Sequence, residues 1–336
     1  MKNILVDLAL YQPGLDLLRS IPGVRVAVAD PIAEMRRPLP ADLLRDVNIL
    51  FCSTPPTNLE DMEALKLIQI SSSGFEHLLD LNLPKRGVRA ANAQGVFDIP
   101  IAEWCVASMI NLERDLRSMI RNQDHGVWDR DARFQREIRG KVVGFWGYGG
   151  LARETARITK AMGMKVHVLA RKAALARPNV YCVPDTGDPE GALPDKCFSL
   201  EQKQEFLAGL DFFILGLPLN PATRGIIGEN ELRALQPKAY LLNPARGPLI
   251  QEKALIRALE EKWIAGAALD THFYYPMPPD HPLWRMPNVI MTPHISGSSR
   301  SPFFLPRVWD LFNQNVRRFL QGQPLLNELS SQQLAG

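Results

Sequence analysis

The sequence predicts a two-domain α/β protein, and three observations carry this fold class. The chain has 336 residues, which is too long for one small hydrophobic core. Short apolar runs alternate with helical stretches along most of its length. Near the middle, a glycine-rich turn lies between a strand-like run and a helical segment, which is the arrangement of a nucleotide-binding βαβ unit.

The glycine-rich turn is the most specific of these signals. An apolar run at 141–146 precedes it, a helical stretch without Pro or Gly follows at 153–162, and a second strand is expected at 166–169. Such a turn lets the backbone approach a pyrophosphate, which then lies at the helix N-terminus. We interpret this segment as a Rossmann dinucleotide-binding unit, with an ordinary tight turn as the alternative. The turn itself is Gly147-Tyr148-Gly149-Gly150-Leu151-Ala152.

The end of the second strand indicates which dinucleotide binds. NAD-binding units usually place Asp or Glu there, to accept a hydrogen bond from the ribose 2′-hydroxyl. This chain instead has Ala170, Arg171 and Lys172, with no carboxylate between Val166 and Ala176. The two cations can neutralise a 2′-phosphate. The sequence therefore predicts NADP(H) as cofactor in preference to NAD(H), with a solvated basic loop as the alternative.

Composition excludes several classes of function. Hydrophobic residues make up 46% and charged residues 22%, as in ordinary globular proteins. A net charge of +3 without a basic stripe argues against nucleic-acid binding. No apolar run reaches the roughly 18 residues that span a membrane. The four cysteines lack metal-ligand spacing, and the N-terminus does not resemble a signal peptide, so we expect a cytoplasmic protein with reduced thiols and no metal.

The position of the glycine-rich turn suggests how the chain is divided. We expect residues 101–298 to form the dinucleotide-binding domain, and 1–100 together with 299–336 to form a smaller, flavodoxin-like substrate domain. A long helix over 101–121 should bridge the domains, and residues 174–198 should form an elongated loop. An amphipathic helix over 303–320, closed by Gly322, should return to the first domain.

Three apolar strands each end in a residue that suits chemistry on a 2-oxo acid. Arg246 follows the strand at 240–243, Asp270 follows 267–269, and His294 follows 289–291. Ligands bind at the carboxyl ends of strands in open α/β sheets, so the three residues should converge. A guanidinium can hold a carboxylate and polarise the carbonyl, while an imidazolium donates a proton. The alternative is that each residue is structural.

The remaining histidines have no comparable context, so we expect surface or packing roles for them. They are His77, His125, His167, His272 and His281.

Together these segments resemble the D-isomer-specific 2-hydroxyacid dehydrogenase family, which includes glyoxylate/hydroxypyruvate reductases, phosphoglycerate dehydrogenase and formate dehydrogenase. The resemblance extends from about residue 65 to residue 327. Beside the glycine-rich turn, the segments that carry it are Ser73-Gly74-Phe75, Asn92–Glu103, Leu217–Thr223, Asn243–Gly247, Leu269-Asp270 and Thr292–Gly297.

The resemblance implies roles for individual residues. The substrate carboxylate would be bound at Ser73, Gly74 and Phe75 together with Arg246, and Asp270 would orient the nicotinamide carboxamide. In this family both termini build the catalytic domain, and homodimers are usual. The cofactor would also contact Leu217, Pro218, Thr223, Asn243, Ala245 and Gly297.

One position departs from the family pattern. After Leu-Asp the family usually continues through four residues to Glu-Pro, and that Glu pairs with the catalytic histidine. Here Tyr275 stands in its place, before Pro276. A phenol is neutral where a carboxylate is charged, so we expect His294 to hold its proton less tightly. Tyr275 therefore joins Arg246 and His294 in the expected catalytic set.

The sequence supports one leading function and two alternatives. The leading one is NADPH-preferring reduction of a small 2-oxo acid, of the glyoxylate or hydroxypyruvate class, to the D-2-hydroxy acid, at mildly acidic pH. The first alternative is an NADP-dependent dehydrogenase of a bulkier 2-hydroxy acid, with an apolar pocket of Phe75, Trp284, Phe303 and Phe304. The second is a dinucleotide-sensing interaction protein in which the Tyr275 replacement has weakened catalysis.

Overall fold

The chain folds into two compact units in a computed structural model that describes residues 1–30, 32, 36–130, 136–171 and 175–335. The first unit comprises Met1–Phe97, Pro178–Val183 and Ser299–Gly336, and the second comprises Asp98–Arg177 and Pro184–Ser298. Lys172, one of the two expected phosphate-binding cations, lies outside the described residues.

The first unit is built on a five-stranded parallel sheet of order β2-β1-β3-β4-β5. This order is flavodoxin-like, which confirms the fold predicted for this part of the chain. The strands are β1 (Lys2–Asp7), β2 (Val24–Val28), β3 (Ile49–Cys52), β4 (Leu67–Ile70) and β5 (Arg89–Ala91). The helices are α1 (Gln12–Arg19), α2 (Ala41–Leu44), α9 (Phe304–Leu320) and α10 (Ser331–Leu334), with short 3-10 turns η1 (Leu59–Asp61), η2 (Glu76–Leu81) and η3 (Leu83–Arg86).

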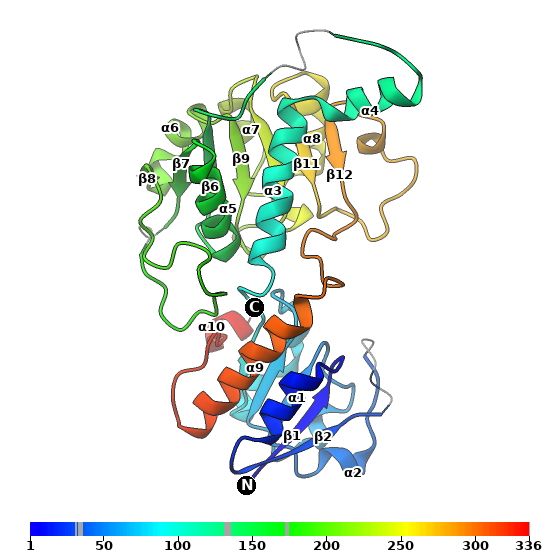
Figure 1. The fold of residues 1–336 in the computed structure, drawn as a ribbon, viewed down its shortest axis with the longest axis vertical. Coiled ribbons are helices and arrows are strands. Elements are labelled where there is room, and N and C mark those ends of the chain that lie inside the picture. Colours follow the sequence, from blue (N-terminus) through cyan, green and yellow to red (C-terminus); the bar gives the residue numbers. More distant parts are fainter. Residues whose placement is uncertain (31, 33–35, 131–135, 172–174, 336) are drawn as a thin grey trace. The chain divides into compact units, whose positions relative to one another are not determined.

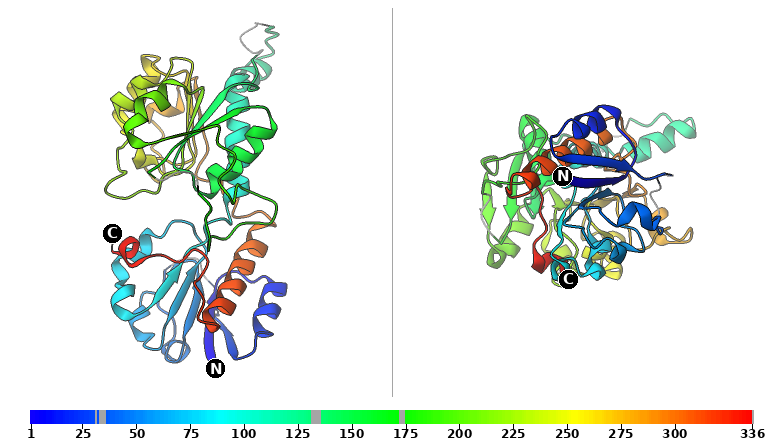
Figure 2. Two further views of the ribbon diagram at one scale, coloured as in Figure 1. Left: turned by 90° about the vertical axis from the view of Figure 1, so that its left-hand side faces the viewer. Right: turned by 90° about the horizontal axis from the view of Figure 1, so that it is seen from below.

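Helices α1 and α9 cover one face of this sheet (Figure 2). The central strand β3 is buried along its whole length, and its Phe51 stacks on Phe312 of α9 with ring centroids 4.0 Å apart. A Cβ on Gly14 of α1 would lie 2.8 Å from the Cβ of Trp309, so glycine permits the two helices to approach. Helix α9 ends just before Gly322, whose φ is +67°. The amphipathic C-terminal helix predicted from sequence is thus confirmed.

The second unit contains a seven-stranded parallel sheet of order β12-β11-β10-β9-β6-β7-β8. The order reverses between β6 and β9, which makes this pair the switch point of a Rossmann sheet. The strands are β6 (Val142–Trp146), β7 (Lys165–Leu169), β8 (Lys196–Phe198), β9 (Phe212–Leu215), β10 (Tyr240–Asn243), β11 (Gly266–Leu269) and β12 (Val289–Met291).

Helices cover both faces of the second sheet (Figures 1 and 2). Helices α3 and α5 pack on one face over Phe145 and Val166, while α6, α7 and α8 pack on the other over Phe213 and Leu241. Strands buried on both faces explain the continuous apolar runs in the sequence. The helices are α3 (Asp98–Glu113), α4 (Leu116–Asp124), α5 (Gly150–Ala161), α6 (Lys203–Ala208), α7 (Glu229–Ala234) and α8 (Glu252–Glu260), with 3-10 turns η5 (Leu200–Gln202), η6 (Gly247–Leu249) and η7 (Pro282–Trp284).

Two expected elements differ in the structure. The long helix predicted over 101–121 is wrong, because Asp115 adopts a left-handed conformation with φ +47° and separates α3 from α4. Aspartate is one of the few residues that adopt this conformation readily, so the break is local in origin. The loop expected over 174–198 is shorter than predicted, because its last residues form β8 on the edge of the sheet.

Part of that loop packs with the first unit. The backbone N–H of Tyr181 donates to Asn327 Oδ1 over 3.0 Å, and the Tyr181 hydroxyl donates to Asp310 Oδ2 over 3.0 Å. Burial, together with the adjacent Asp310 carboxylate, raises the pKa of Tyr181. Residues 178–183 therefore belong with the first unit, although both neighbouring segments belong to the second.

Within the described ranges, no helix is both long and apolar enough to cross a bilayer. The same residues contain no group of three or more His, Cys, Asp or Glu side chains arranged to hold a metal ion.

Candidate active site

The glycine-rich turn lies at the switch point between β6 and β9. Gly147 follows β6 with φ +90°, and a Cβ there would lie 2.7 Å from the carbonyl oxygen of Gly216, which follows β9. Gly149 caps α5, and a Cβ on Gly150 would lie 1.8 Å from Asp98 Oδ2. Side chains are therefore excluded where the backbone begins helix α5. A bare helix N-terminus of this kind suits the pyrophosphate of a dinucleotide, so the residues fit such a cofactor.

Tyr148 anchors the turn to the loop before β8. It is buried, and its hydroxyl donates to Asp188 Oδ2 over 2.7 Å. Burial, followed by the bond to Asp188, raises the pKa of the phenol. The Arg153 guanidinium lies 4.8 Å from the Tyr148 ring centroid and donates to the carbonyl oxygen of Leu175 over 2.6 Å. The side chain of Tyr148 thus packs within the protein, and Ala152 is buried beneath the turn.

The loop after β9 is closed by its own hydrogen bonds. Thr223 Oγ1 donates to the carbonyl oxygen of Pro218 over 2.6 Å, and Asn220 Oδ1 accepts from the Thr223 amide over 3.1 Å. Leu217 Cδ2 lies 3.2 Å from the position of a Cβ on Gly147. The predicted cofactor residues Leu217, Pro218 and Thr223 therefore lie in one loop, whose first residues contact the glycine-rich turn.

A second turn, after β10, presents Arg246. The buried Asn243 accepts from the Ala245 amide over 3.1 Å and donates through Nδ2 to the Arg246 carbonyl oxygen over 2.9 Å. Arg246 is half-buried, and its Nη1 donates to the Ala245 carbonyl oxygen over 2.8 Å. A Cβ on Gly247 would lie 2.2 Å from the carbonyl oxygen of His272, so the turn packs closely against the loop after β11.

The Asp270 carboxylate holds the loop after β12. Its Oδ1 accepts from Thr292 Oγ1 over 2.6 Å and from the Ile295 amide over 2.9 Å. Its Oδ2 accepts from the Ser296 amide over 3.1 Å and from the Ser296 hydroxyl. A carboxylate has about four acceptor positions. All four are therefore used within the protein, so Asp270 positions the loop, and its contact with a nicotinamide carboxamide stays a prediction.

His294 stands in this loop with a constrained backbone. Its φ is +57°, and its amide donates to the carbonyl oxygens of Asp270 over 2.8 Å and Thr292 over 3.0 Å. The imidazole Nδ1 lies 3.1 Å from the Tyr275 hydroxyl oxygen, and the two rings meet at 61°. The structure thus brings Arg246, Asp270, Tyr275 and His294 to one end of three neighbouring strands. Gly297, half-buried, follows Ser296 in the same loop.

The predicted carboxylate-binding residues lie in the first unit. Asn92 Nδ2 donates to the Ser73 carbonyl oxygen over 2.7 Å, and the Ser72 hydroxyl donates to the Gly74 carbonyl oxygen over 2.8 Å. These bonds fix the backbone of the turn that leads into Phe75, the N-cap residue of η2. Asn92 belongs to a segment that carried the family resemblance, but its role in shaping this turn was not predicted.

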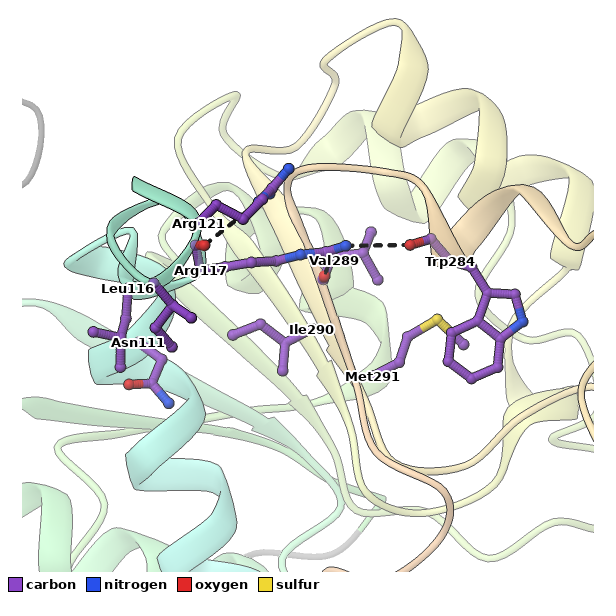
Figure 3. Close-up of a pocket in the computed structure, with 9 residues that line it drawn as sticks. Asn111, Leu116, Arg117, Arg121, Trp284, Val289, Ile290 and Met291 are labelled. Atoms are coloured by element: carbon purple, nitrogen blue, oxygen red, sulfur yellow. Dashed lines mark hydrogen bonds between the residues drawn. The ribbon is translucent and has the colours of Figure 1, made fainter. Parts of the chain in front are cut away.

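A pocket of about 470 Å³ lies elsewhere in the second unit (Figure 3). Its wall includes Ile120, Trp284 and Met291, and Arg117 crosses it to donate to the Trp284 carbonyl oxygen over 3.2 Å. Neither Arg246 nor His294 lines it. Trp284 therefore contributes to a separate pocket, and Phe304 stacks on Phe97 with ring centroids 5.5 Å apart. The apolar substrate pocket of the bulkier-acid alternative stays a prediction.

Comparison with known proteins decides the family. A family model described as D-isomer specific 2-hydroxyacid dehydrogenase, NAD binding domain, matches residues 106–296. A glyoxylate reductase of Thermofilum pendens is 30% identical over 329 residues, which cover 96% of this chain and 92% of that protein. The chain belongs to this family.

Solved structures agree with this assignment. A D-isomer specific 2-hydroxyacid dehydrogenase from Xanthobacter autotrophicus Py2, in complex with NADPH and MES, has a TM-score of 0.77 at 25% identity, covering 99% of each chain. An NADPH-dependent glyoxylate/hydroxypyruvate reductase from Sinorhizobium meliloti shares the fold with a TM-score of 0.75 at 22% identity, covering 99% of this chain and 100% of that one. The resemblance and the two-domain α/β fold predicted from sequence are confirmed.

In this dehydrogenase His272, for which a surface or packing role was expected, is buried, and its Nε2 lies 2.7 Å from the Thr292 carbonyl oxygen. Its backbone amide donates to the Tyr275 hydroxyl oxygen over 3.3 Å. The only sequence signal was its place between Asp270 and Tyr275, because both contacts depend on the fold.

Proposed function

We propose that this dehydrogenase reduces a small 2-oxo acid, of the glyoxylate or hydroxypyruvate class, to the D-2-hydroxy acid, with NADPH as the preferred cofactor. The observation that carries the proposal is the register of the last three strands of the sheet. Asn243 of β10 pairs with Leu269 of β11, which pairs with Met291 of β12. The strands therefore end level, and the loops bearing Arg246 and His294 leave the same edge about 10 Å apart.

The chemistry follows from these side chains. When bound, a reduced nicotinamide supplies the hydride. Arg246 would bind the substrate carboxylate with its planar guanidinium and polarise the adjacent carbonyl. His294, as imidazolium, would hold a proton at Nε2 for the carbonyl oxygen. Asp270 would keep the loop that bears His294 in place, through the four hydrogen bonds described above.

The dinucleotide would be held by the glycine-rich turn at the N-terminus of α5, with the loop of Leu217, Pro218 and Thr223 beside it and Asn243, Ala245 and Gly297 at the strand ends. The amides of Gly74 and Phe75, with Ser73, belong to the first unit, and their contribution to the carboxylate site stays a prediction. Relatives named as glyoxylate reductases support the substrate class.

The preference for NADPH rests on Arg171, which is exposed just after β7. In dinucleotide-binding units the end of this strand faces the ribose, and no carboxylate follows it here. A similar enzyme with NADPH bound supports the proposal. Arg171→Ala should reduce the ratio of kcat/KM for NADPH over NADH about fivefold, because a mostly exposed pair contributes about 1 kcal/mol. Lys165→Ala, which removes an exposed cation at the start of β7, is the control.

The proposed activity is tested by following NADPH and NADH consumption across a panel of 2-oxo acids at several pH values. We expect turnover of glyoxylate or hydroxypyruvate, with NADPH preferred and a mildly acidic optimum. Equal or better efficiency with NADH would refute the cofactor preference. Tight NADPH binding without turnover of any acid would favour the dinucleotide-sensing alternative, in which Tyr275 has weakened catalysis.

We also propose a homodimer in the cytoplasm, as the family resemblance and the cysteine pattern suggest. Light scattering after size exclusion should give a mass near twice that of the 37.7 kDa chain. A mass equal to that of one chain across the micromolar range would refute the dimer.

A further inference from the structure

The segment that follows β11 contacts the His294 loop through both His272 and Tyr275. The His272 imidazole Nε2 lies 2.7 Å from the Thr292 carbonyl oxygen, which also accepts from the His294 amide over 3.0 Å. The His272 amide donates to the Tyr275 hydroxyl oxygen over 3.3 Å, and that oxygen lies 3.1 Å from His294 Nδ1. His272 thus contacts Tyr275 through its backbone amide and the end of β12 through its imidazole, and both of these neighbours contact His294.

The carbonyl oxygen and the backbone amide fix the donor in two of these contacts. A carbonyl oxygen can only accept, so His272 must carry a hydrogen on Nε2. A backbone amide can only donate, so the Tyr275 oxygen accepts from His272. The phenolic hydrogen then remains available for His294 Nδ1, and that hydrogen bond forms when Nδ1 offers a lone pair. A neutral imidazole with its lone pair on Nδ1 carries its hydrogen on Nε2.

Nearby charged groups are engaged elsewhere. The Asp270 carboxylate accepts from Thr292, Ile295 and Ser296. Glu252 accepts from the Tyr274 hydroxyl over 3.1 Å and lies 2.7 Å from His281 Nε2. The contact at His294 Nδ1 is the Tyr275 hydroxyl oxygen, 3.1 Å away.

We propose that His272 and Tyr275 are positioning residues that hold neutral His294 as the tautomer with its hydrogen on Nε2. This inference rests on the proposed function, and it implies that the same site catalyses reduction more readily than oxidation. Neutral His294 in this form can donate a hydrogen bond to a carbonyl, but it lacks the Nε2 lone pair needed to accept a proton from an alcohol. Oxidation of a hydroxy acid would therefore begin from an unproductive tautomer.

Reduction begins from the imidazolium and avoids this cost. The carbonyl carbon gains hydride from the reduced dinucleotide, and its oxygen gains the Nε2 proton. The imidazole is left with a hydrogen on Nδ1, which the second lone pair of the Tyr275 oxygen accepts once the phenolic hydrogen turns away. Oxidation passes through the same tautomer, with the hydrogen on Nδ1, but neutral His294 must first convert to it. The penalty therefore falls on the oxidation rate of the neutral enzyme, without altering the reaction equilibrium.

The direct test reads the tautomer without turnover. We would record nitrogen NMR shifts of ¹⁵N-histidine-labelled full-length protein above the titration of His294, assigning its signals with His294→Gln. The expected spectrum shows a protonated Nε2 and an unprotonated Nδ1 at His294 in the wild type, and the reverse in Tyr275→Glu, whose carboxylate accepts from Nδ1. A wild-type spectrum with the hydrogen on Nδ1 overturns the proposal, whatever the activity panel shows.

The rates of oxidation and reduction in a Tyr275 variant distinguish a positioning role from a purely structural one. Tyr275 is 60% exposed, so Tyr275→Phe should fold normally. Losing a hydrogen bond of about 0.5–1.5 kcal/mol should raise the alkaline oxidation kcat, relative to the acidic reduction kcat, by about 2- to 12-fold. A purely structural loss would lower both rates together and leave their ratio unchanged, which would contradict the proposal.

His272 is tested with a matched pair of variants. His272→Gln places an amide nitrogen near the position of Nε2 and can still donate to Thr292, whereas His272→Leu cannot. We expect the glutamine variant to keep the His294 tautomer and the ratio of oxidation to reduction. The leucine variant keeps the backbone amide that donates to Tyr275 but releases the Thr292 carbonyl oxygen, so the His294 loop should shift and both properties should weaken. If the leucine variant keeps the wild-type tautomer and ratio, His272 has no positioning role.

Discussion

The buried carboxylate of Asp270 offers the sharpest test of how the His294 loop is held. Each of its two oxygens accepts one backbone amide and one hydroxyl, from Ile295 and Thr292 on one side and from Ser296 on the other. Asp270→Asn replaces one oxygen with an NH₂ group. Hydroxyls can rotate to accept from it, but a backbone amide cannot. Whichever way the new side chain turns, one amide therefore faces a donor and loses its partner.

The size of the effect follows from these contacts. An amide left without a partner in a buried place costs about 1–3 kcal/mol, and the bonds that remain lose the roughly 1 kcal/mol that a charged acceptor adds to each. The loop should therefore lose about 3–5 kcal/mol relative to its open state. Since 1.4 kcal/mol corresponds to a factor of ten, amide protection should fall at least about 100-fold.

Hydrogen exchange measured by mass spectrometry gives the readout. The peptide covering 292–298 should lose protection in Asp270→Asn, while the peptide covering β6 serves as an internal reference. Ser296→Ala is the control variant, because it removes a single hydroxyl bond and should reduce protection only about tenfold. If residues 292–298 in Asp270→Asn exchange within threefold of the wild type, the carboxylate does not hold this loop and our assignment of its role is wrong.

Three further changes probe the turn, the loop before β8 and the imidazole. Gly147→Ala should weaken dinucleotide binding at least about tenfold in calorimetry and lower the Tm, because its Cβ would lie 2.7 Å from a carbonyl oxygen at φ +90°. Burial raises the pKa of Asp188, but hydrogen bonds from a tyrosine and two amides more than offset this and lower it overall. Ionised Asp188 therefore stabilises the loop fully above the pKa of the unfolded state, near 4. This stabilisation is lost as the pH falls through the lower pKa of the folded state. Exchange of residues 184–195, corrected for intrinsic rates, should thus accelerate below about pH 4 in the wild type but not in Asp188→Asn. Tyr275→Glu places a carboxylate beside His294, favours the imidazolium and should move the alkaline limb of the reduction pH profile upward; an unchanged limb would mean that residue 275 does not influence this proton.

The strands and the glycine-rich turn could be predicted because their signals are local. A strand buried on both faces reads as a continuous apolar run, as at β10 before Arg246. The turn at Gly147 needs a positive φ, which glycine adopts freely. The placement of chemical residues at strand ends followed from the same patterns. The break at Asp115 was missed because apolar spacing continues across it, and one residue in a left-handed conformation leaves little trace in that spacing.

The sequence by itself determined the fold class, the family and the strand ends that bear Arg246 and His294, since each depends on residues close together in the chain. Tertiary structure alone decided which partners the buried polar groups found. Asp270 is matched to donors more than 20 positions away, His272 to a carbonyl 20 positions away, and Tyr181 to the first unit. A buried polar atom must find a partner wherever packing brings one within about 3 Å, and no local pattern records that choice.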